Sequence, residues 1–177
     1  MLRSALKWAV TTFQIKRDAV RFARSIGVRL GEECRLIGIE SGTFGSEPYL
    51  VSIGNHVTIT SGVRFITHDG GVWVFRHEFP EIDVIAPIKV GNNVFIGLNT
   101  IILPGVSIGD DCVIGAGSLL TKDIPARSVA AGVPARVIKP LEKYLESVHE
   151  KAIYIRSLPL ENKRSFLQSR FLESDQL

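Results

Sequence analysis

From Val90 to Pro125 the sequence repeats every six residues, and this repeat restricts the fold more than any other feature of the chain. The first residue of every hexad is aliphatic: Val90, Ile96, Ile102, Ile108, Ile114 and Leu120. A helix needs apolar residues at spacings of three and four, and a half-buried strand alternates with a period of two, so neither explains the pattern. A strict repeat of six predicts a solenoid in which each hexad forms one short strand and one turn.

The repeat also predicts how the core is built. If three hexads close one coil, residues eighteen positions apart stack on each other, for example Val90 on Ile108 and Ile102 on Leu120. Successive coils would then lie one parallel-strand spacing apart, roughly 4.8 Å. We therefore expect an all-β solenoid, a parallel β-helix whose first-column side chains point inward.

An earlier block follows the same rule, with Ile53, Ile59 and Phe65 in the first column. Phe65 and Val90 are 25 residues apart, which is not a multiple of six. An insertion must therefore leave the coil and return to it in phase, and we place this insertion at residues 68–87.

The two ends of the chain have apolar residues at helical spacing. We expect an N-terminal helix over residues 1–25, a β-helix over residues 26–139, and a C-terminal helical segment over residues 140–177. These helices would pack on the coil or on a neighbouring subunit. Trp8 and the cations around it would also suit a membrane surface, but a packing helix is the favoured interpretation.

Composition excludes several classes of protein. Hydrophobic residues make up 45% and charged residues 22% of the 177 residues, as in an ordinary folded domain. A net charge of +3 without a nucleic-acid motif gives no reason to expect a nucleic-acid partner. Two cysteines set no disulfide framework, and we find no signal peptide or membrane span, so a cytoplasmic protein is expected.

The insertion carries the side chains with the most chemistry. His68 directly follows the last strand of the first block, at a rigid edge, as a general base requires. A surface histidine that caps the loop is the alternative. Trp73 could stack on a sugar ring, while Asp69, Arg76 or Glu78 could bind its hydroxyl groups. His56, His68 and His77 have no spacing typical of a zinc site, so we expect no metal.

The stretch "TKDIPARSVAAGVPARVIK" at residues 121–139 is more specific than the aliphatic repeat. Together with the repeats before it, it resembles the C-terminal half of hexapeptide-repeat acetyltransferases, in particular the maltose, galactoside and xenobiotic O-acetyltransferases. The resemblance covers about residues 50–139. It implies a left-handed β-helix, a homotrimer, and acetyl-coenzyme A bound between neighbouring subunits.

The resemblance also implies roles for individual residues. His68 would remove the proton from the acceptor, and Glu47 or Asp69 could orient it. Residues along the pantetheine arm would be Gly97, Leu98 and Ala116, and residues near the nucleotide phosphates would be Thr121, Lys122, Arg136 and Lys139.

The expected function is therefore O-acetylation of a sugar hydroxyl, in the biosynthesis of a cell-surface polysaccharide. Two alternatives remain open at this point. The acceptor could be an amine of an amino sugar or a xenobiotic, or the chain could be a non-catalytic hexapeptide-repeat scaffold subunit.

Overall fold

The computed structural model describes residues 2–172, with side chains from Val10 onward, so the side chain of Trp8 lies outside the described part. The chain divides into two compact units, Met1–Tyr144 and Leu145–Leu177, which are described separately. Within residues 2–172, no helix combines the length and the apolar composition that a membrane crossing requires.

The first unit is built from three sheets. Sheet A contains β1 (Arg29–Leu30), β3 (Val51–Ile53), β6 (Ile88–Val90) and β9 (Ser107–Ile108). Sheet B contains β2 (Arg35–Leu36), β4 (Thr58–Ile59), β7 (Phe95–Ile96), β10 (Val113–Ile114), β12 (Ser128–Gly132) and β13 (Ala135–Pro140). Sheet C contains β5 (Arg64–Phe65), β8 (Ile101–Ile102) and β11 (Leu119–Leu120).

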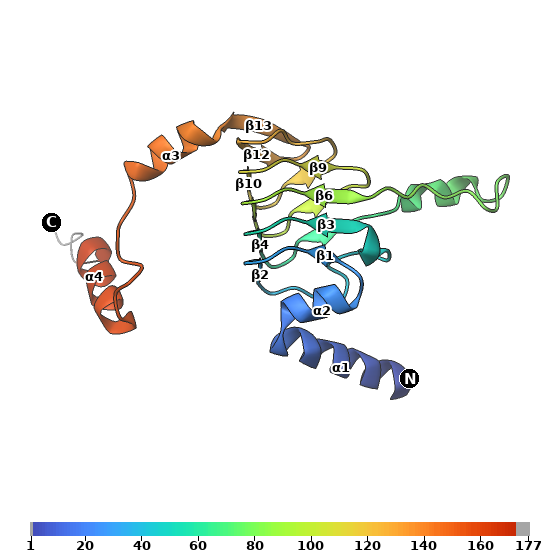
Figure 1. Cartoon of the computed structure of the whole chain (residues 1–177), viewed down its shortest axis with the longest axis horizontal. Helices are drawn as coiled ribbons and strands as arrows, with labels where there is room; N and C mark the ends of the chain where they lie inside the picture. The colour runs from blue at the N-terminus through green and yellow to red at the C-terminus, as the bar shows by residue number, and fades with distance from the viewer. Residues whose placement is uncertain (1, 173–177) are drawn as a thin grey trace. The chain divides into compact units, whose positions relative to one another are not determined.

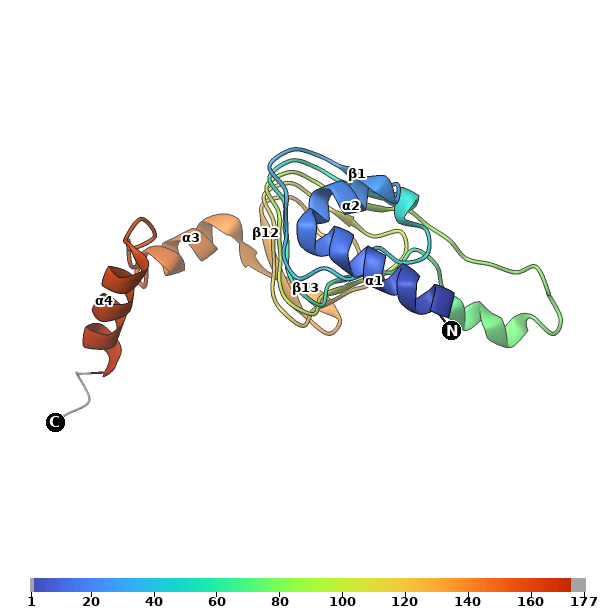
Figure 2. The ribbon, with the colours of Figure 1, turned by 90° about the horizontal axis from the view of Figure 1, so that it is seen from below.

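From β3 to β11 the chain visits sheets A, B and C in turn, so each set of three strands forms one coil (Figure 1). Viewed along their axis, the coils superimpose on a three-sided outline (Figure 2). All sheet pairs are parallel except β12 with β13. We name the three edges of this coil after the sheets that they join: the A–B, B–C and C–A edges.

The register confirms the predicted stacking. Val90 pairs with Ile108, Ile96 with Ile114, and Ile102 with Leu120. All six first-column side chains are buried. Their contacts, repeated from coil to coil, form the core, because each inward aliphatic side chain meets the one above it.

The insertion leaves and re-enters the coil at the C–A edge, where the register still fits on both sides. Ile53 pairs with Val90, and Phe65 with Ile102, across thirty-seven residues instead of eighteen. The insertion therefore adds nineteen residues without disturbing the stack. It projects from the coil and contains a short 3₁₀ helix, η2 (Gly70–Phe75) (Figure 1).

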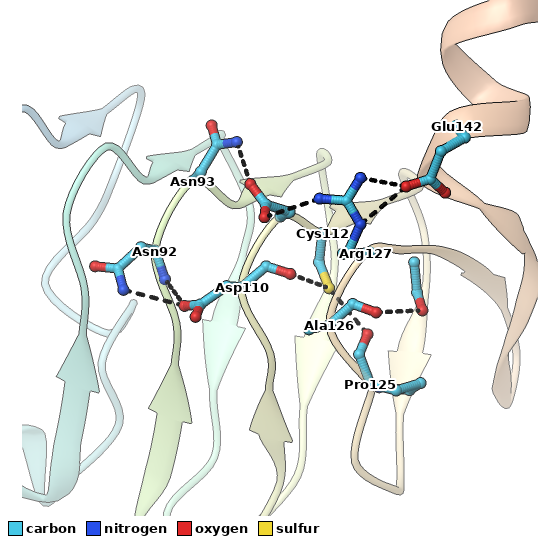
Figure 3. Close-up of polar contacts among 10 residues, drawn as sticks. Asn92, Asn93, Asp110, Cys112, Pro125, Ala126, Arg127 and Glu142 are labelled. Atoms are coloured by element: carbon cyan, nitrogen blue, oxygen red, sulfur yellow. Dashed lines mark hydrogen bonds and ion pairs between the residues drawn. The ribbon is translucent and has the colours of Figure 1, made fainter.

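The A–B edge shows how turn residues hold the coils together. The side chain of Asp110 accepts a hydrogen bond from the backbone N–H of Asn92 at 2.6 Å (Figure 3). The Asn92 side chain in turn accepts one from Asn55 N–H at 2.9 Å. A Cβ atom at Gly91 would lie 2.8 Å from the backbone nitrogen of Asp110. The turn therefore needs glycine at Gly91 and an amide or carboxylate in the next position.

Arg127 is the last of the turn residues stacked along the A–B edge, and it binds the first residues of the helix that follows. Its guanidinium forms ion pairs with Glu142 and with Asp111, the latter at 3.6 Å (Figure 3). Its carbonyl oxygen accepts the N–H of Leu141 at 2.9 Å. These bonds tie the first residues of α3 (Leu141–His149) to the A–B edge.

The N-terminal residues, expected as one helix, form two: α1 (Leu2–Arg17) and α2 (Ala19–Ser25). The break falls at Asp18, whose side chain accepts the N–H of Arg21 at 2.9 Å and so caps α2. Phe22 and Ala23 of α2 are buried in the core cluster at the first coil. Figure 2 shows both helices across this end of the coil.

The second unit contains the remainder of α3 and helix α4 (Leu160–Leu172). At the end of α3, Nδ1 of His149 lies 3.2 Å from the hydroxyl of Tyr154, which is in the segment before α4.

Candidate active site

His68 stands on the antiparallel stem of the insertion at residues 68–87, which we call the excursion loop. On one side of it, the N–H of Ala86 donates to Thr67 O at 2.9 Å, and on the other the N–H of Asp69 donates to Val84 O at 2.8 Å. His68 itself pairs with Ile85 in this stem. The backbone at His68 is therefore fixed where the loop joins the coil.

An irregular segment of the first coil brings a carboxylate to the same place. This coil has no strand in sheet C, and residues 37–50 take that side instead. The N–H of Phe65 donates to Thr43 O at 2.8 Å, and Phe44 stacks on Phe65 with ring centroids 5.3 Å apart. A Cβ at Gly45 would lie 2.7 Å from Phe65 O, so the chain passes close beneath β5 before η1 (Pro48–Leu50) begins.

Glu47, at the end of this segment, contacts His68. Its Oε2 atom lies 3.0 Å from Nδ1 of His68 and accepts the hydroxyl of Thr67 at 2.5 Å. The side chain of Glu47 is 18% exposed and that of His68 is 37% exposed. The hydrogen bond from Thr67, followed by that from His68, holds the pKa of Glu47 below its ordinary value, so Glu47 is a carboxylate at neutral pH.

The ionised Glu47 fixes the tautomer of a neutral His68. A carboxylate only accepts hydrogen bonds, so the ring nitrogen facing it must carry the hydrogen. With the hydrogen on Nδ1, the lone pair of Nε2 remains available to accept a proton. An imidazole held in this way can act as a general base.

Asp69, the other candidate to orient His68, is engaged elsewhere. Its carboxylate accepts the N–H of Gly71 at 2.8 Å and caps η2. Of the two carboxylates named from the sequence, the structure brings Glu47 and not Asp69 to the imidazole. The sequence analysis did not single out Thr67, and its only sequence signal is its place directly before His68. In the structure its side chain is fully buried.

The excursion loop displays large apolar side chains. Trp73 is 72% exposed, and Val74, Phe75 and Phe79 are also exposed. Arg76 lies 3.9 Å from Asp83 across the loop, measured from Nη2 to Oδ1. His77 is exposed in the same loop.

Two of the predicted phosphate-binding cations come together. Lys122 and Arg136 line one hollow of about 280 Å³, together with Asp123. Lys122 holds the same position after β11 that Thr67 holds after β5, because β5 pairs with β8 and β8 with β11. Lys122 is therefore on the C–A edge, as His68 is, two coils further along, or roughly 10 Å, whereas Arg136 reaches the hollow from β13, where it pairs with Ala131. Thr121 precedes Lys122 on this edge.

Lys139 does not line this hollow; it lies three residues beyond Arg136 in β13, where it pairs with Val129. The three residues predicted to line the pantetheine path are separate as well. Gly97, Leu98 and Ala116 lie on the B–C edge, between β7 and β8 or between β10 and β11. A Cβ at Gly97 would lie 2.5 Å from the backbone nitrogen of Ala116, so the stacking of coils already requires this glycine.

His56 is part of the A–B edge, where its Nδ1 lies 2.8 Å from Asn93 Oδ1. Across the described residues, no three His, Cys, Asp or Glu side chains gather closely enough to bind a metal ion. A cavity of about 700 Å³, larger than the hollow at Lys122 and Arg136, lies between α1 and the first coil. Its lining includes Ile15, Leu36 and Ile39 but not His68.

The coil and its repeats define the class of protein. Residues 87–122 match the family described as the hexapeptide repeat of succinyl-transferase. Protein CapG of Staphylococcus aureus is 53% identical over 151 residues, covering 85% of this chain and 88% of that protein.

Two further relatives are named acetyltransferases. Galactoside O-acetyltransferase of Escherichia coli (strain K12) is 46% identical over 97 residues, which are 54% of this chain but only 46% of that enzyme. The crystal structure of a galactoside acetyltransferase in complex with coenzyme A superimposes with a TM-score of 0.50 at 30% identity, over 77% of this chain and 74% of that one. The chain belongs to the hexapeptide-repeat acetyltransferase family.

Proposed function

We propose that this acetyltransferase transfers the acetyl group of acetyl-coenzyme A to a hydroxyl group of a sugar, with His68 as the general base. The observation that carries the proposal is the contact of Nδ1 of His68 with the Glu47 carboxylate, which leaves Nε2 as the proton acceptor. A scaffold subunit has no need for a carboxylate that fixes the tautomer of an edge histidine. The named relatives, which act on galactosides and bind coenzyme A, support these substrate classes.

The proposed reaction is a direct transfer. Acetyl-coenzyme A supplies the acetyl group as a thioester. Nε2 of His68 accepts the proton of the acceptor hydroxyl while the hydroxyl oxygen forms its bond to the acetyl carbon. Glu47 stabilises the positive charge that forms on the imidazole, since Nδ1–H still donates to its carboxylate. The bond between the acetyl carbon and sulfur then breaks, the proton passes from Nε2 to the leaving sulfur to give free coenzyme A, and His68 is neutral again.

The hollow with Lys122 and Arg136 fits the phosphate groups of the coenzyme. Two cations in one concave surface suit phosphate, and arginine can bind it through two parallel hydrogen bonds. Because Lys122 and His68 share the C–A edge, an extended arm along this edge would bring the thioester to the base.

A homotrimer completes this proposal. Gly97, Leu98 and Ala116 lie on a different edge from His68, so they can line the pantetheine path only if the B–C edge of a neighbouring copy faces the C–A edge. Leu98 is 50% exposed, as a contact surface requires. The exposed Trp73, Phe75 and Phe79 of the excursion loop would be covered by the same neighbour. We propose the left-handed sense for the coil, as in the family that the sequence resembles.

We further propose that the acceptor is a unit or precursor of a cell-surface polysaccharide, acetylated in the cytoplasm. Trp73 could stack on the sugar, and Arg76 could bind its hydroxyl groups. In this arrangement, the coil of residues 26–139 carries the sites for both substrates.

An assay of thiol release from acetyl-coenzyme A, across a panel of sugars and nucleotide sugars, tests the proposal. The wild-type protein should release thiol with at least one sugar and acetylate a hydroxyl, as mass spectrometry of the product would show. The His68→Ala variant should lose about 10²- to 10⁴-fold in kcat. His77→Ala is the matched control, because His77 lies in the same loop outside the stem. A His68→Ala variant as active as the wild type would exclude His68 as the base.

A further inference from the structure

The hydroxyl of Thr67 is the first member of a chain of hydrogen bonds that ends at His68. We propose that Thr67 is a positioning residue, whose hydroxyl holds the Glu47 carboxylate so that His68 keeps its hydrogen on Nδ1 and its lone pair on Nε2. This inference rests on the proposed function, because it concerns the same base.

The geometry places both bonds on a single oxygen. Oε2 of Glu47 accepts the hydroxyl of Thr67 at 2.5 Å and faces Nδ1 of His68 at 3.0 Å. Thr67 is completely buried, so its hydroxyl has no competing water. Glu47 comes from the first coil, whereas Thr67 and His68 are neighbours at the end of the second. The carboxylate therefore joins two coils through one atom.

The hydroxyl matters because it keeps Oε2 of Glu47 directed at Nδ1. If Oε2 turned away, a neutral imidazole would no longer be held to one tautomer and could carry its hydrogen on Nε2. That tautomer has no lone pair directed at the acceptor and cannot act as the base. A buried donor on Oε2 favours the ionised carboxyl group, and this bond is the main cause of the lowered pKa of Glu47.

The backbone of Thr67 has a separate structural role, which a substitution can preserve. Its carbonyl oxygen accepts the N–H of Ala86 at 2.9 Å in the stem of the loop. Thr67→Val keeps this bond and the branched shape of the side chain but removes the hydroxyl. Thr67→Ser keeps the hydroxyl and removes only a methyl group. The two variants therefore separate the hydrogen bond from packing.

The first readout is kinetic, in the thiol-release assay. Thr67→Val should lower kcat about tenfold while the KM values for both substrates stay within about twofold, as for an interaction made at the base. Thr67→Ser should retain kcat within about threefold of the wild type. Equal losses in both variants would assign the effect to packing and overturn the proposal.

The second readout uses the full-length protein without substrates. Nitrogen-15 NMR of the imidazole should show the Nδ1–H tautomer of neutral His68 in the wild type and in Thr67→Ser, and a larger fraction of Nε2–H in Thr67→Val. Carbon-13 titration of the Glu47 carboxyl should show a higher pKa in Thr67→Val than in the wild type. Unchanged spectra in Thr67→Val would overturn the proposal. If the wild type released no thiol with any sugar, the proposed function would fail, while these spectra would still decide the role of Thr67.

Discussion

Oε2 of Glu47 lies 3.0 Å from Nδ1 of His68, although the two residues belong to different coils. Glu47 ends the first coil and His68 ends the second, so the stacking of coils at the C–A edge brings them together. The pair is half-shielded: the imidazole is open enough to meet an acceptor, and the carboxylate is largely covered. This relationship makes the roles of both residues open to experiment.

Removing the charge of Glu47 should slow the proposed reaction. Glu47→Gln keeps the size of the side chain, but its neutral amide cannot stabilise the imidazolium or fix the tautomer of His68 in the same way. We expect kcat to fall at least about tenfold with little change in KM. Asp69→Asn is the matched control, because Asp69 caps η2 and does not contact His68. Wild-type kcat in Glu47→Gln would contradict the proposed role.

The same carboxylate should make stability depend on pH. Its pKa in the folded protein lies below the ordinary value of 4.5, so its contribution is fully present above about pH 4.5. The contribution is lost as the pH falls through the lower folded-state pKa, where Glu47 becomes protonated. Urea unfolding should therefore show the wild type more stable than Glu47→Gln at pH 7, with a difference that shrinks below about pH 4.5.

The control for this measurement is Glu81→Gln, a change of an exposed residue in the excursion loop. Its stability relative to the wild type should vary less over the same pH range. A wild-type advantage over Glu47→Gln that grew as the pH fell would reverse the expected sign.

The two cations of the hollow, Lys122 and Arg136, should act on the binding of the acetyl donor. Replacing Lys122 and Arg136 by alanine should raise the KM for acetyl-coenzyme A about tenfold or more, while kcat at saturation stays close to that of the wild type. Lys139→Ala should have a smaller effect, because Lys139 lies in β13 as Arg136 does but does not line the hollow. An effect of Lys139→Ala larger than that of the double variant would place the phosphates elsewhere.

Gly97→Ala should lower the free energy of unfolding of the protein even when no ligand is bound. The added Cβ would meet backbone atoms of the next coil, with Ala116 N at 2.5 Å and Ile114 O at 2.8 Å, and these atoms cannot rotate away. We expect a cost of about 1–3 kcal/mol and a Tm lowered by several degrees. Gly42→Ala is the control, since nothing lies within 4 Å of a Cβ at that position. An unchanged Tm with weakened binding of coenzyme A would instead assign Gly97 to the ligand.

The sequence alone determined the core and its register. Ile96 and Ile114 could be placed in one stack from their spacing, because each hexad repeats the same local geometry and the repeat extends the stack without long-range information. The position of the excursion loop followed from the break in the same count. His68 could be singled out because it comes directly after the last strand of the interrupted block.

Only the tertiary structure decided which groups meet His68 and which edges carry the other candidates. Glu47 lies in a segment without a repeat, so no spacing could place it. By sequence Asp69 is an equal candidate, but in the structure its carboxylate accepts the N–H of Gly71 instead. Thr67 became a partner of Glu47 only through the approach of the first coil to the second. Such contacts depend on the path of an irregular backbone segment. That path is fixed by packing between residues far apart in the sequence, here that of Phe44 against Phe65.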